Sequence, residues 1–373
     1  MLTRDDTRPR VVLHVGLPKS GTTFLQHALR HNAEALADRG VLYPQTADDV
    51  MFRAALDVRG SHKAWGRRRK DVAGSWDSLC ATARRHVGTT IVSHELLAAA
   101  CSRQVDTALS MLKGLDVHVV VTARDPVRQL VSEWQEGVKH GRRLTFADYE
   151  AAVRSGEGDL AHRFMAAQSL PDVLHRWGRH LPADRVHLVV APPPGSPPDV
   201  LWREFAAVAG FDPAGFPAGR GPLNESLGAD EVDLLRRVNT ALDGRLQQPV
   251  YGRLAKHRLA HQLLAGRRTR PLQAPVQVRD ALADVAEQWV KEVQRVGWSV
   301  HGTLADLVPA EPSEPGQHPD TVDPHAQVDV AADVVAALLL DLEAAQAEAA
   351  DAETRRRSWK KRAKQLRRVL AQT

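Results

Sequence analysis

A lysine, a glycine and three hydroxyl side chains stand together near the start of the chain. These residues are Lys19, Ser20, Gly21, Thr22 and Thr23. They follow a buried-strand pattern at 11–15 and precede apolar residues at helical spacing from Phe24 to Leu36. A loop between a strand and a helix directs backbone N–H groups and the positive end of the helix toward one point. The stretch therefore predicts a site for an anion such as phosphate or sulfate.

A candidate general base follows another strand pattern. His94 and Glu95 come directly after the apolar run at 89–93. Ligands of an open parallel sheet bind beyond the carboxyl ends of its strands, and either side chain has the chemistry to accept a proton there. A purely structural role, in which Glu95 caps a helix, also fits this position.

An arginine and a serine follow a third strand pattern, at 117–122. Arg124 stands on the turn, Asp125 and Pro126 are favourable first residues of a helix, and Ser132 lies about two turns into it. This spacing places both side chains on a further strand-loop-helix unit, where ligands of an open parallel sheet bind. An ion pair between Arg124 and Asp125, with Ser132 an ordinary helix hydroxyl, is the structural alternative.

The order of residues in the first loop differs from that of the Walker A motif, in which the lysine follows the second glycine. Here Lys19 precedes Gly21. This order resembles the 5′-phosphosulfate loop of sulfotransferases that use 3′-phosphoadenosine 5′-phosphosulfate (PAPS). The pair Arg124 and Ser132 resembles the 3′-phosphate-binding element of the same family. The chain is thus similar to the bacterial PAPS-dependent sulfotransferases.

The resemblance implies an α/β, three-layer P-loop-like fold with a central parallel sheet. It implies in-line transfer of a sulfuryl group from PAPS to a hydroxyl or amine of a carbohydrate, lipid or small-molecule acceptor. Lys19 would neutralise the bridging oxygen, residues 20–23 would hold the 5′-phosphate, and Arg124 with Ser132 the 3′-phosphate, without a metal. The resemblance also implies a base after the second long strand, where we favour Glu95 over His94.

Two other classes of function remain open. A P-loop kinase or NTPase would bind a nucleoside triphosphate with Mg²⁺, and the position of the lysine argues against it. A catalytically silent scaffold would keep the nucleotide-binding fold and act through its C-terminal segment. Intact Lys19, Arg124 and Ser132 argue against the scaffold.

The composition is that of a globular protein with a basic C-terminal end. The 373 residues are 43% hydrophobic and 25% charged, with a formal net charge of +5. Residues 354–373 include nine Lys or Arg and no Asp or Glu, so the remainder is net acidic and no nucleic-acid partner is expected. Cys80 and Cys101 provide no disulfide framework and no metal cluster. Without an apolar signal-peptide core or an 18-residue apolar run, we expect a cytoplasmic protein.

The pattern divides the chain into three parts. A sulfotransferase-like domain is expected at 1–308, a proline-rich linker at 309–327 and a coiled-coil helix with a basic end at 328–373. Apolar or small residues recur three and four apart in this helix, broken once at Arg356. The seam predicts a homo-oligomer, and peripheral contact of the basic end with an anionic membrane, or with a partner, is the alternative.

Some segments give weaker predictions. Residues 45–78 are expected to be irregular, and a helical pattern starts at Leu96 and continues to Leu112. The basic segment 251–270 is expected to be an amphipathic helix with a solvated face, with contact to an anionic substrate as the alternative. The acceptor and the number of subunits are not encoded in any of these patterns.

Overall fold

A computed structural model describes residues 8–44, 49–219, 226–267, 272–312 and 316–370. Its centre is a six-stranded, wholly parallel sheet with the order β2-β3-β1-β4-β5-β6. The strands are β1 (Arg10–His14), β2 (Val41–Leu42), β3 (Thr89–Ser93), β4 (Asp116–Ala123), β5 (Val186–Val190) and β6 (Ser299–His301). Strand β1 lies between β3 and β4, so the ends of these three strands meet at one edge.

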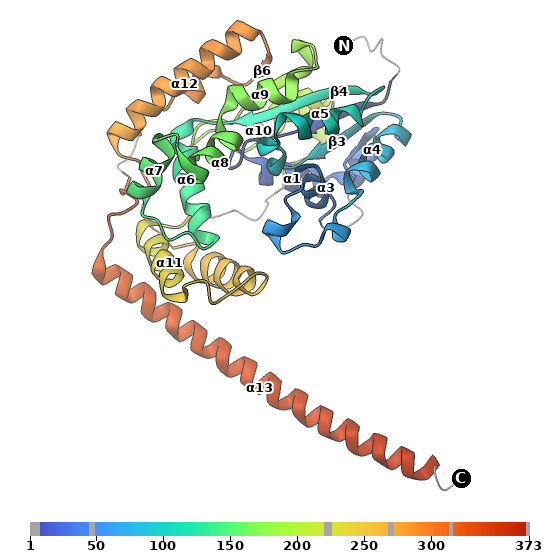
Figure 1. The fold of residues 1–373 in the computed structure, drawn as a ribbon, viewed down its shortest axis with the longest axis vertical. Helices are drawn as coiled ribbons and strands as arrows, with labels where there is room; N and C mark the ends of the chain where they lie inside the picture. The colour runs from blue at the N-terminus through green and yellow to red at the C-terminus, as the bar shows by residue number, and fades with distance from the viewer. Residues whose placement is uncertain (1–7, 45–48, 220–225, 268–271, 313–315, 371–373) are drawn as a thin grey trace.

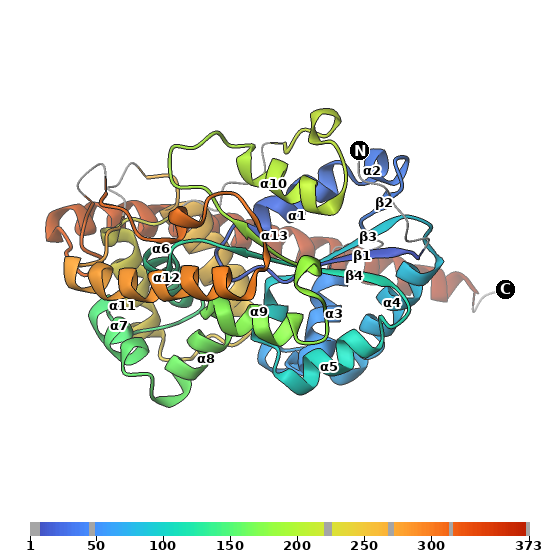
Figure 2. The ribbon, with the colours of Figure 1, turned by 90° about the horizontal axis from the view of Figure 1, so that it is seen from above.

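Helices cover both faces of the sheet, which explains why its central strands are continuous apolar runs. Helices α1 and α10 lie on one face, and α3, α4, α5 and α9 lie on the other (Figure 2). The α-helices of this body are α1 (Thr22–His31), α2 (Ala33–Ala37), α3 (Val50–Arg59), α4 (Ser75–Arg85), α5 (Ser102–Ser110), α9 (Leu170–Gly178) and α10 (Val200–Ala209). The predicted three-layer α/β fold with a central parallel sheet is confirmed.

A second group of helices forms a lobe beside the sheet (Figure 1). The lobe comprises α6 (Pro126–Lys139), α7 (Phe146–Arg154), α8 (Gly158–Gln168), α11 (Ala229–Leu242), the π-helix η6 (Gly252–Leu264), α12 (Val276–Val296) and the start of α13 (Pro324–Leu370). Its helices share a separate apolar core that includes Trp134, Phe146, Val232 and Leu259. Helix α6 starts at the end of β4, so it joins the lobe directly to the predicted site.

Short 3₁₀ helices complete the described part of the chain. They are η1 (His62–Trp65), η2 (Arg69–Asp71), η3 (Glu95–Ala99), η4 (Ala183–Arg185), η5 (Pro213–Gly215) and η7 (Leu304–Leu307). The prediction that 45–78 is irregular was wrong for α3, whose Met51, Ala54 and Ala55 pack into the main core. The helical pattern at 96–112 is divided into η3 and α5, because the chain is extended at Ala100 and Cys101.

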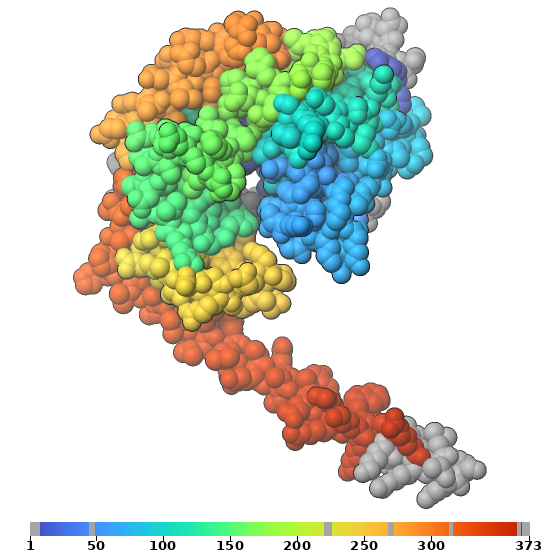
Figure 3. Space-filling view, in the orientation of Figure 1, coloured from blue at the N-terminus to red at the C-terminus, as the bar shows by residue number. Residues whose placement is uncertain are grey.

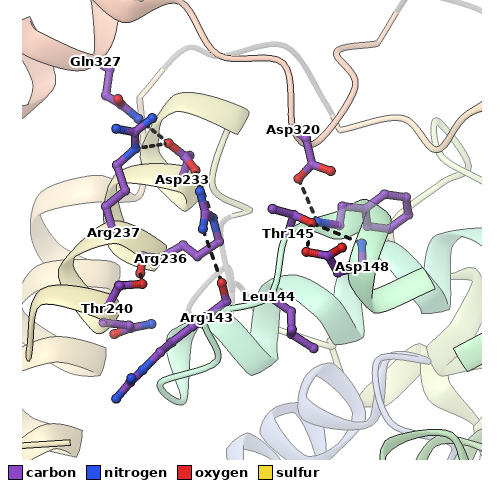
Figure 4. Close-up of polar contacts among 12 residues, drawn as sticks. Arg143, Leu144, Thr145, Asp148, Asp233, Arg236, Arg237, Thr240, Asp320 and Gln327 are labelled. Carbon is purple, nitrogen blue, oxygen red and sulfur yellow. Dashed lines mark hydrogen bonds and ion pairs between the residues drawn. The ribbon is translucent and has the colours of Figure 1, made fainter. Parts of the chain in front are cut away.

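The end of the proline-rich segment binds the helical lobe. The carboxylate of Asp320 accepts hydrogen bonds from the first backbone N–H groups of α7, at Phe146 (2.7 Å) and Ala147 (2.8 Å) (Figure 4). Gln327 donates to Asp233 of α11 at 2.8 Å, in the same view. The Asp320 contacts satisfy N–H groups at the start of α7 that have no partner within their own helix. Together with the Gln327 contact, they hold the start of α13 against the lobe.

The predicted long C-terminal helix is present as α13, which spans 47 residues. Its first turns bury Val330 and Val334 in the core of the lobe. The helix then leaves the body and extends away from it (Figure 1). Among the described helices, none is long and apolar enough to cross a membrane.

Candidate functional site

The loop after β1 has the backbone geometry of an anion-binding turn. Lys19 has a φ of 68° and Gly21 a φ of 96°, and α1 begins at Thr22. Gly16 allows close packing beneath the loop, because a Cβ built there would lie 2.3 Å from the Thr122 hydroxyl oxygen. The loop therefore turns sharply into the N-terminus of α1, where free N–H groups and the helix dipole favour an anion.

Hydrogen bonds below the loop hold it to the neighbouring strand. The Ser20 hydroxyl lies 2.6 Å from the Leu17 carbonyl and 2.7 Å from the Thr122 hydroxyl, and the Leu17 amide donates to the Thr122 carbonyl at 2.9 Å. Ser20 is buried, so its side chain braces the loop from inside. Its backbone N–H also donates to the Leu17 carbonyl, at 3.2 Å, so both polar groups of Ser20 are engaged within the loop itself.

A buried histidine ties the three central strand ends together. Its two ring nitrogens lie 2.8 Å from the Ser93 hydroxyl and 3.1 Å from the Thr122 hydroxyl. Burial lowers the pKa of His14 to about 3, with a smaller effect from His94. His14 is therefore a neutral structural residue beneath the loop.

One hydroxyl group near the loop is available for a ligand. The Thr22 hydroxyl is buried and has no hydrogen-bond partner among the described residues. Buried hydroxyl groups normally have a partner, so this one fits a ligand oxygen at the N-terminus of α1. Thr23, the next residue, is exposed.

The structure brings Arg124 and Ser132 into direct contact. Nη2 of Arg124 lies 2.5 Å from the Ser132 hydroxyl and donates to the Arg128 carbonyl at 2.7 Å. The side chain of Asp125 caps α6 by accepting from the Arg128 amide at 2.9 Å. Burial lowers the pKa of Arg124 to about 10, so the guanidinium keeps its charge at neutral pH. Its buried Nε has no partner within the described ranges.

Lys19 binds a carboxylate of the protein itself. Its Nζ lies 3.1 Å from one oxygen of Glu136 on α6, and Nζ of Lys256 on η6 lies 2.8 Å from the other oxygen. Burial alone would raise the pKa of Glu136, but the hydrogen bond from His140 and the charges of Lys19 and Lys256 hold it well below its usual range. One ionised carboxylate therefore keeps two lysines close to each other.

Further charged groups surround this carboxylate. Lys139 is buried, which lowers its pKa to about 8 despite the opposing charge of Glu136. The pKa of the Glu133 carboxyl is raised, chiefly by burial. Three lysines thus surround one firmly ionised carboxylate, and this region favours an anionic ligand.

The two candidate bases have different environments. Nδ1 of His94 accepts a hydrogen bond from the Leu96 amide at 3.1 Å, and burial lowers the pKa of His94. Glu95 is partly exposed, with one carboxylate oxygen 3.4 Å from Nε2 of Gln26 and 3.7 Å from Nδ1 of His94. Gln26 lies one turn into α1, so it connects Glu95 to the helix that begins at the anion loop.

Aromatic rings line one side of the site. Phe52 lies between His94 and Trp65, with ring centroids 5.6 Å and 5.2 Å apart, and Trp65 lies 6.0 Å from His140. The row crosses from α3 to α6. Figure 3 shows a hollow between the blue segment, which contains α3, and the green and yellow segments, which contain α6 and α11.

Sequence analysis missed Glu136, Lys256 and Gln26. Glu136 lies one helical turn after Ser132, which is a signal that the sequence offered. Lys256 comes from the segment expected to be an amphipathic helix with a solvated face, and its Nζ pairs with Glu136 instead of facing solvent alone. The three arginines at 67–69 form ion pairs with nearby acids, which are Asp49, Asp71 and Asp57 in that order. These acids balance the charge of the arginines.

Comparison with known proteins gives one weak similarity of fold. No protein-family model and no curated protein matches the chain. A crystal structure of a sulfotransferase from Alicyclobacillus acidocaldarius aligns with a TM-score of 0.39 and 15% identity, over 63% of this chain and 94% of that one.

Proposed function

We propose that the chain is a PAPS-dependent sulfotransferase that modifies a hydroxyl or amine of a carbohydrate, lipid or small-molecule acceptor. The observation that carries this proposal is that two groups of potential anion-binding side chains follow adjacent strands, the loop after β1 and the Arg124–Ser132 pair after β4. PAPS has phosphate groups at both ends of one ribose. A nucleoside triphosphate presents its phosphates at one end only.

The residues of both sites fit this donor. At the 5′ end, the N-terminus of α1, the unpaired Thr22 hydroxyl and Lys19 supply donors and positive charge. At the 3′ end, the Arg124 guanidinium and the Ser132 hydroxyl supply donors, with Nε of Arg124 lacking a partner among the described residues. Charge-assisted bonds of this kind are among the stronger ones that a protein makes to phosphate.

Sulfuryl transfer needs positioning and charge stabilisation from the protein. PAPS supplies the sulfuryl group, whose bond to the phosphate oxygen breaks while the bond to the acceptor oxygen or nitrogen forms. The electron pair of the broken bond stays on the phosphate oxygen, where the ammonium of Lys19 neutralises it. Lys19 must leave Glu136 to reach this oxygen, and Lys256 remains to balance the carboxylate.

The acceptor also loses a proton, and we assign this proton to Glu95. Its carboxylate is partly exposed and lies beside α1, while Nδ1 of the neighbouring His94 is engaged with the Leu96 amide. A carboxylate within hydrogen-bond reach of the acceptor serves as a general base. His94 is the alternative base through its other ring nitrogen.

Calorimetric titration with adenosine 3′,5′-bisphosphate and with ADP plus Mg²⁺ tests the proposal. We expect the bisphosphate to bind, and Arg124→Ala to weaken its binding at least tenfold, a loss of about 1.4 kcal/mol. Arg179→Ala, which removes an exposed arginine paired with Asp106, is the control and should leave affinity unchanged.

Either of two results would overturn the assignment. A preference for ADP with Mg²⁺ favours a kinase or NTPase. Binding of neither nucleotide favours a scaffold that has lost its ligand.

A further inference from the structure

Helix α13 exposes an apolar seam on a side that the body does not use. The helical lobe binds α13 through Val330 and Val334, and through ion pairs that join Asp333 to Arg267 and Asp341 to Arg258. The seam residues are exposed by 56% at Val335, 42% at Leu338, 54% at Leu342 and 69% at Trp359. Leu339 and Leu340 beside the seam are exposed as well, and an exposed apolar seam of this length is typical of a coiled-coil partner surface.

The seam is symmetric about Thr354. Counting outward from this residue, the positions 352, 349, 345, 342 and 338 mirror 356, 359, 363, 366 and 370. Reversing the direction of the helix therefore superimposes the seam on itself. The seam residues occupy the a and d positions of a heptad repeat, for example 342 and 349 at a and 338 and 345 at d. In the antiparallel alignment each a position faces a d position of the other helix, so the two seams stay in contact along their length.

The mirrored residues also match in size. Two inner layers pair Ala345 with Ala363 and Ala349 with Trp359, and the outer seam positions 338 and 342 fall opposite 370 and 366. The largest side chain of the seam thus faces an alanine. Cores pack best when large and small residues face each other.

The charges of the helix are mirrored with opposite sign. Residues 341–353 include five Asp or Glu and no Lys or Arg, while residues 355–368 include nine Lys or Arg and no Asp or Glu. An antiparallel pair lays each acidic segment against a basic one. A parallel pair in register would instead place the two basic segments together, at a cost in electrostatic repulsion.

From these three observations we propose that α13 binds a second copy of this chain as an antiparallel coiled coil over residues 338–370, centred on Thr354. Asp341 of each chain then lies opposite residue 367 of the other. At about 1.5 Å per residue, the two Asp341 residues are roughly 40 Å apart along the pair. The two bodies sit at opposite ends of the paired helices, so each site faces its acceptor separately.

Disulfide trapping in the full chain tests the direction of pairing. Two variants, Ala345→Cys and Ala363→Cys, are made with Cys101→Ser, because Cys101 is exposed whereas Cys80 is buried. We expect mild oxidation to link a mixture of the two variants into dimers and to leave each variant alone unlinked. If Ala345→Cys alone forms disulfide-linked dimers as readily as the mixture does, the helices pair in parallel and the proposal is overturned.

Charge exchange tests the register without a disulfide. Glu348 and Arg362 both flank the seam at g positions, which face each other in an antiparallel pair, so Glu348→Lys alone, and Arg362→Glu with Lys360→Glu, should each weaken self-association about tenfold. Mixing these two variants should restore association. The control Glu343→Lys changes the same charge at a position outside the seam and should have little effect.

Light scattering and sedimentation of the unmodified chain complete the test. A concentration-dependent dimer is expected. A monomer at all concentrations, whether or not it binds anionic phospholipid vesicles, would exclude the pairing.

Discussion

Glu136 of α6 accepts a hydrogen bond from Lys19 at 3.1 Å, so the lysine of the anion loop is held by a carboxylate 117 residues away. This carboxylate competes with any anion that uses Lys19. A part-exposed ion pair of this kind is worth about 1 kcal/mol or less.

Replacing Glu136 by Gln should therefore increase affinity for adenosine 3′,5′-bisphosphate by about three- to fivefold, since Lys19 no longer leaves a charged partner. Calorimetry at low and moderate salt measures the change. Glu150→Gln, which likewise removes an ion-paired carboxylate, here the partner of Arg154 within α7, is the control. Weaker binding in Glu136→Gln would mean that the carboxylate positions Lys19 for the ligand instead of competing with it.

Glu95→Gln should lower kcat at least a hundredfold and leave the affinity for adenosine 3′,5′-bisphosphate within about twofold, because the base acts on the acceptor only. Release of the bisphosphate from PAPS in the presence of an accepted hydroxyl compound measures turnover. His94→Asn should mainly reduce stability, by about 1 kcal/mol, through loss of the bond to the Leu96 amide. The reverse pattern would assign the base to His94.

Truncation at two points should show that only the first part of α13, which binds the helical lobe, contributes to the stability of the body. A chain that ends after Leu342 keeps Val330, Val334 and the Asp341–Arg258 pair, and should unfold at the same denaturant midpoint as the full chain. A chain that ends after Pro309 exposes the surface covered by both valines and loses the contacts of Asp320 with α7. It should lose about 3 kcal/mol or more in free energy of unfolding. Equal stability of the two truncated chains would contradict this division of α13.

Stability should fall on acidification because His14 stays neutral in the folded protein. The folded pKa of His14 is lowered to about 3, whereas the unfolded chain binds this proton near pH 6.5. The contribution of His14 to the free energy of unfolding is therefore fully present above about pH 6.5. It falls by about 1.4 kcal/mol per pH unit as the pH drops from 6.5 toward 3. His14→Gln should reduce the slope between pH 6 and pH 4, measured by urea unfolding, by about this amount. An unchanged slope would mean that the other buried histidines account for the acid sensitivity.

The sequence by itself determined the local elements of the site. The strand at 11–15, the loop at 19–23 and the Asp125 cap of α6 depend on residues close in the chain, so their patterns predicted them correctly. The contact joins Arg124, on the turn before α6, to Ser132, in the second turn of that helix, so both partners lie close in the chain. The central parallel sheet was implied by the resemblance of these local motifs to a known family, and the six parallel strands confirm it.

Only the tertiary structure decided which distant groups meet at the loop. Lys256 reaches Glu136 across 120 residues because η6 packs against α6, and no local pattern encodes that packing. His94 resembled a free base in the sequence, yet its nitrogen is engaged by a backbone amide and its ring is buried. Local spacing fixes the direction of side chains on one element, whereas burial and ion pairing depend on how separate elements share a core.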